Sequence, residues 1–173
     1  MSSGIEMTRE RADVAETLAK HRHFVRYTVQ GLTDEQASQR TTVSELTLGG
    51  IVKHLTAVES QWADFVVNGP AGTPSWNDPA ALKAHADGFV MLPGETLAGL
   101  LADYDAACAA TDELLVSLPD LDVSQPLAEA PWNEPGARWS ARRVLLHLIA
   151  ETSQHAGHAD MLREAIDGQK TMG

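Results

Sequence analysis

The chain of 173 residues carries thirteen basic and twenty-four acidic side chains, which give a formal net charge of −11, and none of its apolar stretches approaches the roughly 20 residues that span a bilayer. One domain over residues 1–173 accommodates this length and buries about 70% of its unfolded surface, so no disulfide bond is needed. The charge argues against nucleic acid and membrane surfaces as partners, since both repel it and the densest basic group, Arg138, Arg142 and Arg143, is small.

The first predicted helix runs from about Thr8 to Val29, because apolar residues recur there on one face, and it ends near Gly31. The segment before it, residues 1–7, lacks the basic and apolar parts of a signal peptide. His21 falls on the apolar face. We expect it to be a hydrogen-bonded histidine at the edge of the core rather than a site residue.

A second helix is predicted from about Thr47 to Asn68. Apolar residues recur there every three or four positions, and Gly69 and Pro70 end the run. His54 stands in the middle of this apolar face. A histidine at such a position needs either a hydrogen-bond partner or a metal ion.

The segment from Gly69 to Gly94 is rich in proline and turn-forming residues and contains Trp76 and His85. It is predicted to be a long loop with a short helix from Pro79 to Gly88. Loops of this length are uncommon unless they build a site or an interface.

The third long helix is predicted from Glu95 to Ser117, with Cys108 on its apolar stripe. A single cysteine cannot form an internal disulfide bond, and together with the absence of a secretory leader it favours a reducing compartment, the cytoplasm. We expect Cys108 to be a small core residue rather than a nucleophile, because it sits at a helical core spacing.

A second proline-rich loop, Leu118 to Trp139, contains Trp132 and precedes the last helix. Ser140 is a suitable N-cap for that helix, which runs to about Asp167. Strand-like alternation is weak throughout the chain. The prediction is therefore an all-α four-helix bundle with two long Pro/Gly-rich loops.

The last predicted helix carries polar residues on the face that should enter the core. When each residue is placed 100° further round the helix, the residues within about 60° of Glu151 include Val144, Leu148, His155, His158 and Leu162. This face is apolar at both ends and polar in its middle, and His147 lies near it one turn earlier. Burying a carboxylate with imidazoles costs several kcal/mol without compensation, and a divalent cation supplies that compensation.

Glu151 and His155 are four residues apart, so both side chains leave one face of the helix about 6 Å apart along its axis and can converge on one ion. Packing of the second helix against the last would add His54 as a third ligand. Three protein ligands leave positions open for water or substrate, as in catalytic sites. The same residues could instead satisfy one another as a buried hydrogen-bonded network, and the residues alone leave both alternatives open.

His158 follows His155 by three positions and shares its face, so we expect it to face the substrate and to act in proton transfer. Its alternative role is that of the third ligand in place of Glu151. Two imidazoles and one carboxylate suit zinc, nickel, iron or manganese.

Two segments resemble a known family: "TLGGIVKHLTAVESQWADFVVNG" (residues 47–69) and "WSARRVLLHLIAETSQHAGHADMLREAIDG" (residues 139–168). They are similar to the DinB-like superfamily of four-helix-bundle metalloproteins, in particular to the branch named after the mini-circle protein. The mycothiol-dependent maleylpyruvate isomerases belong to the same superfamily. The resemblance covers nearly the whole chain.

The resemblance implies an up-down-down-up bundle with one metal ion held by a histidine of the second helix and two residues four apart on the fourth. These positions correspond to His54, Glu151 and His155. Many relatives carry histidine in place of Glu151, and the glutamate version resembles that of the maleylpyruvate isomerases. Members are often homodimers, and several branches use mycothiol, bacillithiol or glutathione.

Three functions remain open on these grounds. The first is a metal-dependent transferase or isomerase that presents a low-molecular-weight thiol such as mycothiol to a small electrophile, with Trp62, Trp76 and Trp132 along the pocket. The second is a non-catalytic metal-dependent binding or stress-response module. The third is a metal-free helical scaffold whose polar stripe is satisfied by hydrogen bonds and water.

Overall fold

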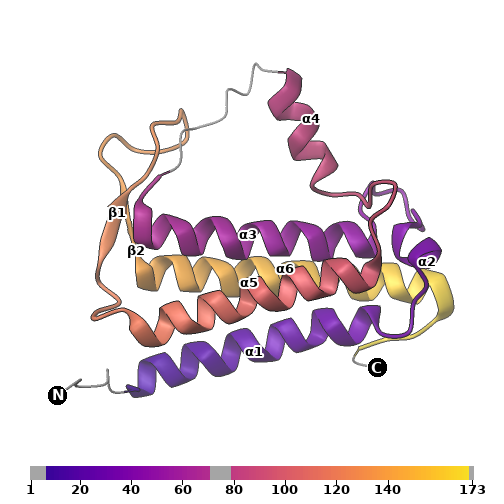
Figure 1. The fold of residues 1–173 in the computed structure, drawn as a ribbon, viewed down its shortest axis with the longest axis horizontal. Helices are drawn as coiled ribbons and strands as arrows, with labels where there is room; N and C mark the ends of the chain where they lie inside the picture. The colour runs from indigo at the N-terminus through magenta and orange to yellow at the C-terminus, as the bar shows by residue number, and fades with distance from the viewer. Residues whose placement is uncertain (1–6, 71–78, 172–173) are drawn as a thin grey trace.

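The computed structural model describes residues 7–70 and 79–171, and this part of the chain is mainly helical (Figure 1). Its long helices are α1 (Arg9–Val29), α3 (Leu48–Asn68), α5 (Leu97–Ser117) and α6 (Ala141–Asp167). The shorter elements are the helices α2 (Asp34–Ser38) and α4 (Pro79–Asp87) and the strands β1 (Ser124–Pro126) and β2 (Arg138–Ser140).

Each long helix begins at a hydroxyl residue whose side chain accepts a hydrogen bond from a backbone N–H of the first turn. These N-caps are Thr8, Thr47, Thr96 and Ser140. A cap of this kind stabilises a helix by about 1 kcal/mol. The predicted helices therefore start and end within about two residues of the observed ones, because capping is encoded locally.

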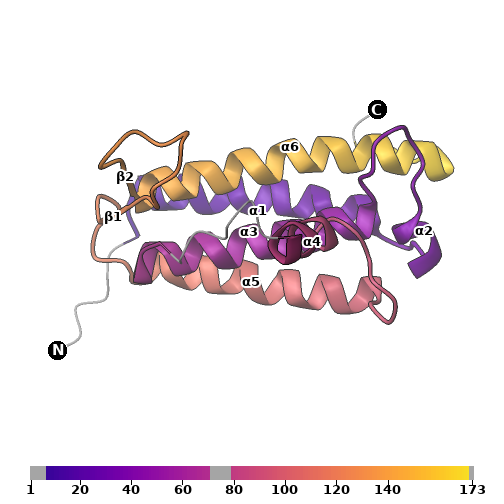
Figure 2. The same cartoon turned by 90° about the horizontal axis from the view of Figure 1, so that it is seen from above.

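The four long helices lie side by side (Figures 1 and 2). Helices α1 and α6 run in one direction and α3 and α5 in the other, as the colour gradient in Figure 1 shows. The helix pairs in closest contact are α1 with α6, α3 with α5, and α3 with α6. No helix among the described residues is long and apolar enough to cross a membrane.

Two features were not predicted. Helix α2 forms in the connection between α1 and α3, for which no helix was predicted, and Thr33 and Gln36 make a reciprocal capping box at its start. The expected loop from Leu118 to Trp139 contains strand β1 and the first two residues of strand β2. The two strands pair antiparallel, with Gln125 opposite Trp139. Strands of three residues are too short to show alternation, and cross-strand pairing decides whether they form. The fold is therefore mostly helical with a small sheet.

The core contains a charged pair that periodicity also did not reveal. The Nε and Nη2 atoms of Arg22 donate to the two carboxylate oxygens of Glu59 at 2.7 and 2.9 Å, and both side chains are at most 2% exposed. The hydroxyl of Thr111 donates to the same carboxylate at 2.6 Å. This network ties α1, α3 and α5 together, with every charged atom of the carboxylate paired.

Candidate metal centre

The structure brings together three predicted ligands at the interface of α3 and α6. One ligand atom from each of His54, Glu151 and His155 lies within 4.8 Å of the other two. The Nε2 atoms of His54 and His155 lie 3.5 and 3.7 Å from the same Glu151 oxygen, Oε2. The side chains are 13–25% exposed, so the cluster lies just beneath the surface.

These separations suit a bound ion better than hydrogen bonds. A nitrogen-to-oxygen hydrogen bond spans about 2.7–3.2 Å, which is shorter than either distance. Ligands held at about 2.1 Å around a tetrahedral ion lie about 3.4 Å apart, close to the observed spacing. The buried Nδ1 of His155 also has no hydrogen-bond partner among the described residues. Two imidazoles and a carboxylate in this arrangement fit a divalent transition metal.

The electrostatic environment keeps the two histidines in the neutral form that binds metal. Burial lowers the pKa of His54, and nearby His85 adds to this effect, while Glu151 opposes it. Burial also lowers the pKa of His155, with further contributions from His54 and His158 against the opposing effect of Glu151. Neutral imidazoles can coordinate a cation, whereas imidazolium cannot.

The segment after α4 holds His54 in place. The ring of Phe89 stacks on that of His54, with centroids 4.4 Å apart and an interplanar angle of 23°. Lys53, the residue before His54, donates to the backbone carbonyl of Val90 at 3.4 Å and pairs with Glu95 at 2.7 Å. The long connection between α3 and α5 therefore restricts the rotamer of one candidate ligand.

The second oxygen of Glu151, Oε1, faces His147 at 3.8 Å from its Nε2. The His147 ring is held edge-on by two indoles, Trp62 at 5.0 Å and Trp139 at 5.2 Å between centroids. These indoles stack on each other at 4.7 Å. The carboxylate of Glu151 thus has histidine nitrogens on both sides, and the aromatic pair fixes one of them.

The other predicted site residues occupy different positions. The His158 ring lies 5.4 Å from that of His155, outside the three-ligand cluster, and its buried Nδ1 has no hydrogen-bond partner within the described part of the chain. Trp62 lies beside His147, Trp132 is 67% exposed, and Trp76 lies outside the described residues.

Two residues outside the predicted site also have defined surroundings. His21 lies edge-on to Phe24, at 6.0 Å between ring centroids, and is not part of the three-ligand cluster. Burial raises the pKa of Cys108 to about 11, so its thiol is protonated at neutral pH, as expected of a core cysteine.

Sequence reasoning missed Phe89 and Trp139 as neighbours of the centre. Both belong to segments expected to be loops, where periodicity carries no information about which side chains face inward. Trp139 directly precedes Ser140, the N-cap of α6, and an apolar residue at that position often packs against the helix that follows. This position was the one signal in the sequence that Trp139 contacts α6.

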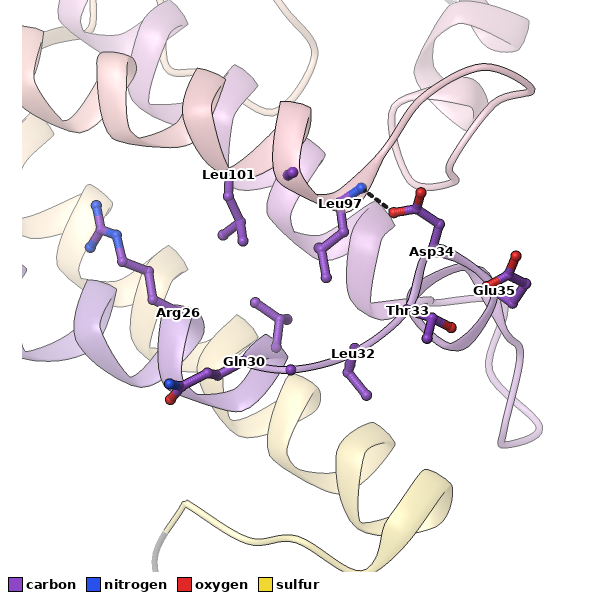
Figure 3. A pocket seen from close by; sticks show the side chains of 11 residues that line it. Arg26, Gln30, Leu32, Thr33, Asp34, Glu35, Leu97 and Leu101 are labelled. Carbon is purple, nitrogen blue, oxygen red and sulfur yellow. Dashed lines mark hydrogen bonds between the residues drawn. The ribbon is translucent and has the colours of Figure 1, made fainter.

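A separate cavity of about 590 Å³ lies where the end of α1 and the turn after it meet the start of α5 (Figure 3). Leu97 and Leu101 line it, and the Asp34 carboxylate accepts a hydrogen bond from the backbone N–H of Leu97 at 2.7 Å. Its cation, Arg26, is already paired with Asp105 at 2.7 Å. None of the candidate ligands lines this cavity.

Comparison with protein families identifies the chain. The model of the mycothiol-S-transferases, a DinB-like family, matches residues 13–168. The chain belongs to the mycothiol-S-transferase family. The match covers most of α1 and all of the other three long helices, and it confirms the predicted DinB-like resemblance. It also makes mycothiol, a small-molecule thiol, the substrate class associated with the family.

Structural comparison agrees on the fold of this mycothiol-S-transferase family member. A crystal structure of a conserved protein from Enterococcus faecalis is similar to it, with a TM-score of 0.68 and 15% sequence identity, over 91% of this chain and 97% of that chain. At this level of identity the likeness concerns the fold alone. No curated protein matches the chain.

Proposed function

We propose that this protein is a divalent-metal-dependent transferase or isomerase that uses a low-molecular-weight thiol such as mycothiol. The observation that carries the proposal is the cluster of His54, Glu151 and His155 in a chain whose family is named for mycothiol transfer. Neither the cluster nor the family match suffices alone. Clusters of carboxylate and histidine side chains also occur in proteins that catalyse no reaction, and a family name does not locate a site.

In this proposal each residue has a defined task. His54, Glu151 and His155 hold the ion, which, when bound, supplies positive charge that stabilises the cosubstrate sulfur as thiolate. His158, whose ring lies 5.4 Å from that of His155, accepts or returns the proton of the thiol. Phe89 covers one face of His54 and limits access of water to that side.

The test is thiol consumption by untagged protein loaded with zinc, nickel, iron or manganese in turn. Mycothiol is supplied with a panel of electrophiles, and free thiol is followed over time. We expect metal-dependent thiol loss with at least one electrophile, and none with His54→Ala. Stoichiometric metal binding without thiol loss across the panel would instead identify the alternative, a non-catalytic metal-dependent binding or stress-response module.

Three further features belong to the proposal. The bundle is the up-down-down-up bundle of DinB-like proteins, as the antiparallel course of α1 and α3 supports. We infer a cytoplasmic protein from its single, buried cysteine. We also infer a homodimer from the resemblance, which size-exclusion chromatography with light scattering tests.

A further inference from the structure

Arg143 differs from every other arginine that the structure describes. Each of the others directs its guanidinium at an oxygen of a carboxylate, hydroxyl or backbone carbonyl. The neighbouring Arg142, for example, pairs with both Glu10 and Asp122. The guanidinium of Arg143 has no oxygen partner within residues 7–70 and 79–171, although its side chain is exposed on an acidic protein.

The guanidinium is nevertheless held in a defined position. Its central carbon lies 4.2 Å from the ring centroid of Trp139, a cation–π contact. Such a contact uses the flat face of the group. Its N–H donors lie at the edge of the plane and stay available, in the fork geometry that matches one carboxylate.

Arg143 is continuous with the candidate metal centre along α6. Arg143, His147, Glu151 and His155 follow one another at four-residue intervals, so they form one ridge that winds around the helix by about 40° per step. Trp139 contacts both Arg143 and His147, and His147 faces Glu151. Eight residues of helix separate Arg143 from Glu151 by about 12 Å along the axis.

We propose that Arg143, supported by Trp139, binds the carboxylate of the electrophilic co-substrate. This inference rests on the proposed function, because a thiol at the metal centre needs a second substrate. The indole of Trp139 contacts both Arg143 and His147, and that of Trp62 contacts His147, so aromatic surface lies beside the residues between Arg143 and Glu151. The ligand is a conjugated or aromatic carboxylic acid with its carboxylate at Arg143. Its electrophilic carbon lies at the end remote from the carboxylate, toward Glu151, because about 12 Å of helix separates the two residues. A single guanidinium presents two parallel N–H donors, which match the two oxygens of one carboxylate.

The experiment measures binding of cinnamate and of its uncharged analogue cinnamamide to the metal-loaded protein, by calorimetry and tryptophan fluorescence. Cinnamate should bind more tightly than cinnamamide. In Arg143→Gln cinnamate affinity should fall about 10-fold to 100-fold while cinnamamide affinity and metal content stay unchanged. The cinnamate affinity of Arg143→Lys should lie between those of the wild type and Arg143→Gln, because lysine keeps the positive charge but lacks the two parallel N–H donors of the guanidinium.

The matched control is Arg142→Gln, an adjacent arginine whose donors are already occupied by carboxylates. It should leave cinnamate affinity within about 2-fold of the wild type, because the charge it removes is already neutralised locally. Equal losses in Arg142→Gln and Arg143→Gln would overturn the proposal in favour of general charge attraction. So would cinnamate binding that depends on His54 but not on Arg143, since the carboxylate would then lie on the metal.

The two proposals fail in different ways. If cinnamate binding depends on Arg143 but the protein consumes no mycothiol, the proposed thiol reaction is overturned and the proposed carboxylate subsite is supported. Metal-dependent mycothiol consumption with no difference between cinnamate and cinnamamide would leave the reaction and overturn the subsite.

Discussion

Gly50 and Phe89 approach each other so closely that no side chain fits between them: a Cβ added to Gly50 would lie 1.8 Å from the Phe89 carbonyl oxygen. The neighbouring Gly49 has a similar relationship with Met91, whose Sδ would lie 2.2 Å from an added Cβ. Two glycines in the first turn of α3 thus let the segment after α4 pack on the helix. That packing is what brings Phe89 onto His54.

Gly50→Ala should therefore destabilise the protein and loosen the centre. The obstacle is a backbone carbonyl, which cannot rotate away as a side chain can, so we expect a loss of about 1–3 kcal/mol. Thermal unfolding measures it, and metal affinity should fall as well because the Phe89 contact with His54 is displaced. Gly157→Ala is the control: nothing lies within 4 Å of its added Cβ in mid-helix, so stability should stay equal or rise. Equal destabilisation by both substitutions would contradict this account.

His54→Ala should lower metal affinity by more than about 100-fold. Loss of a residue that only supports a metal ligand lowers affinity by about 10-fold to 100-fold, and His54 is itself a candidate ligand. His85→Ala should retain full occupancy, because His85 lies beside Phe89 at 5.3 Å between ring centroids and outside the ligand cluster. Elemental analysis of untagged proteins, together with competition against a chelator, measures both. The same occupancy in the two variants would refute the assignment of His54.

Acid should release the ion. Burial lowers the pKa of His54 and of His155 below the ordinary value of 6.5, so both rings are neutral at pH 7 and protons compete with metal only at lower pH. Metal affinity should stay nearly constant from pH 7.5 to 6.5 and then fall, approaching about 100-fold per pH unit once both ligands protonate. Isothermal titration across this range is the measurement, and a steep fall already between pH 8 and 7 would contradict neutral, depressed histidines.

The stability of the metal-free protein should depend on pH with the same sign. When the folded-state pKa of a histidine is depressed, the unfolded chain binds more protons at pH values between that pKa and about 6.5. The contribution of such a histidine to the free energy of unfolding is therefore fully present above pH 6.5. It is lost as the pH falls from 6.5 toward the lowered pKa of the folded state. Urea unfolding at pH 7.5 and at pH 5.5 tests the direction.

Glu59→Gln should cost about 3–5 kcal/mol, because it leaves the buried guanidinium of Arg22 without its charged partner. Asp112→Asn removes the other carboxylate on Arg22, at 2.7 Å, but that side chain is 56% exposed, so we expect less than about 1 kcal/mol. Denaturant midpoints of the two variants give the comparison. A smaller effect for Glu59→Gln than for Asp112→Asn would show that the pair contributes little to the fold.

Local patterns in the sequence determined the helices and one half of the candidate centre. Thr8, Thr47 and Ser140 mark helix starts because capping involves only the first turn. Glu151 and His155 had to share a face because the helical period sets the angle between residues four apart. The family resemblance carried by these helices was confirmed by the match over residues 13–168.

Only the tertiary structure decided how far the His54 ring lies from that pair, and which residues surround it. Periodicity gives the direction of a side chain from its own helix axis, but the distance and rotation between two helices depend on all the side chains packed between them. For the same reason the sequence did not reveal Phe89 and Trp139 as neighbours of the centre, because they lie between the long helices, where no helical periodicity gives their direction. Nor did it reveal the buried pairing of Arg22 with Glu59. A charge appears exposed in a sequence until its partner on another helix is known.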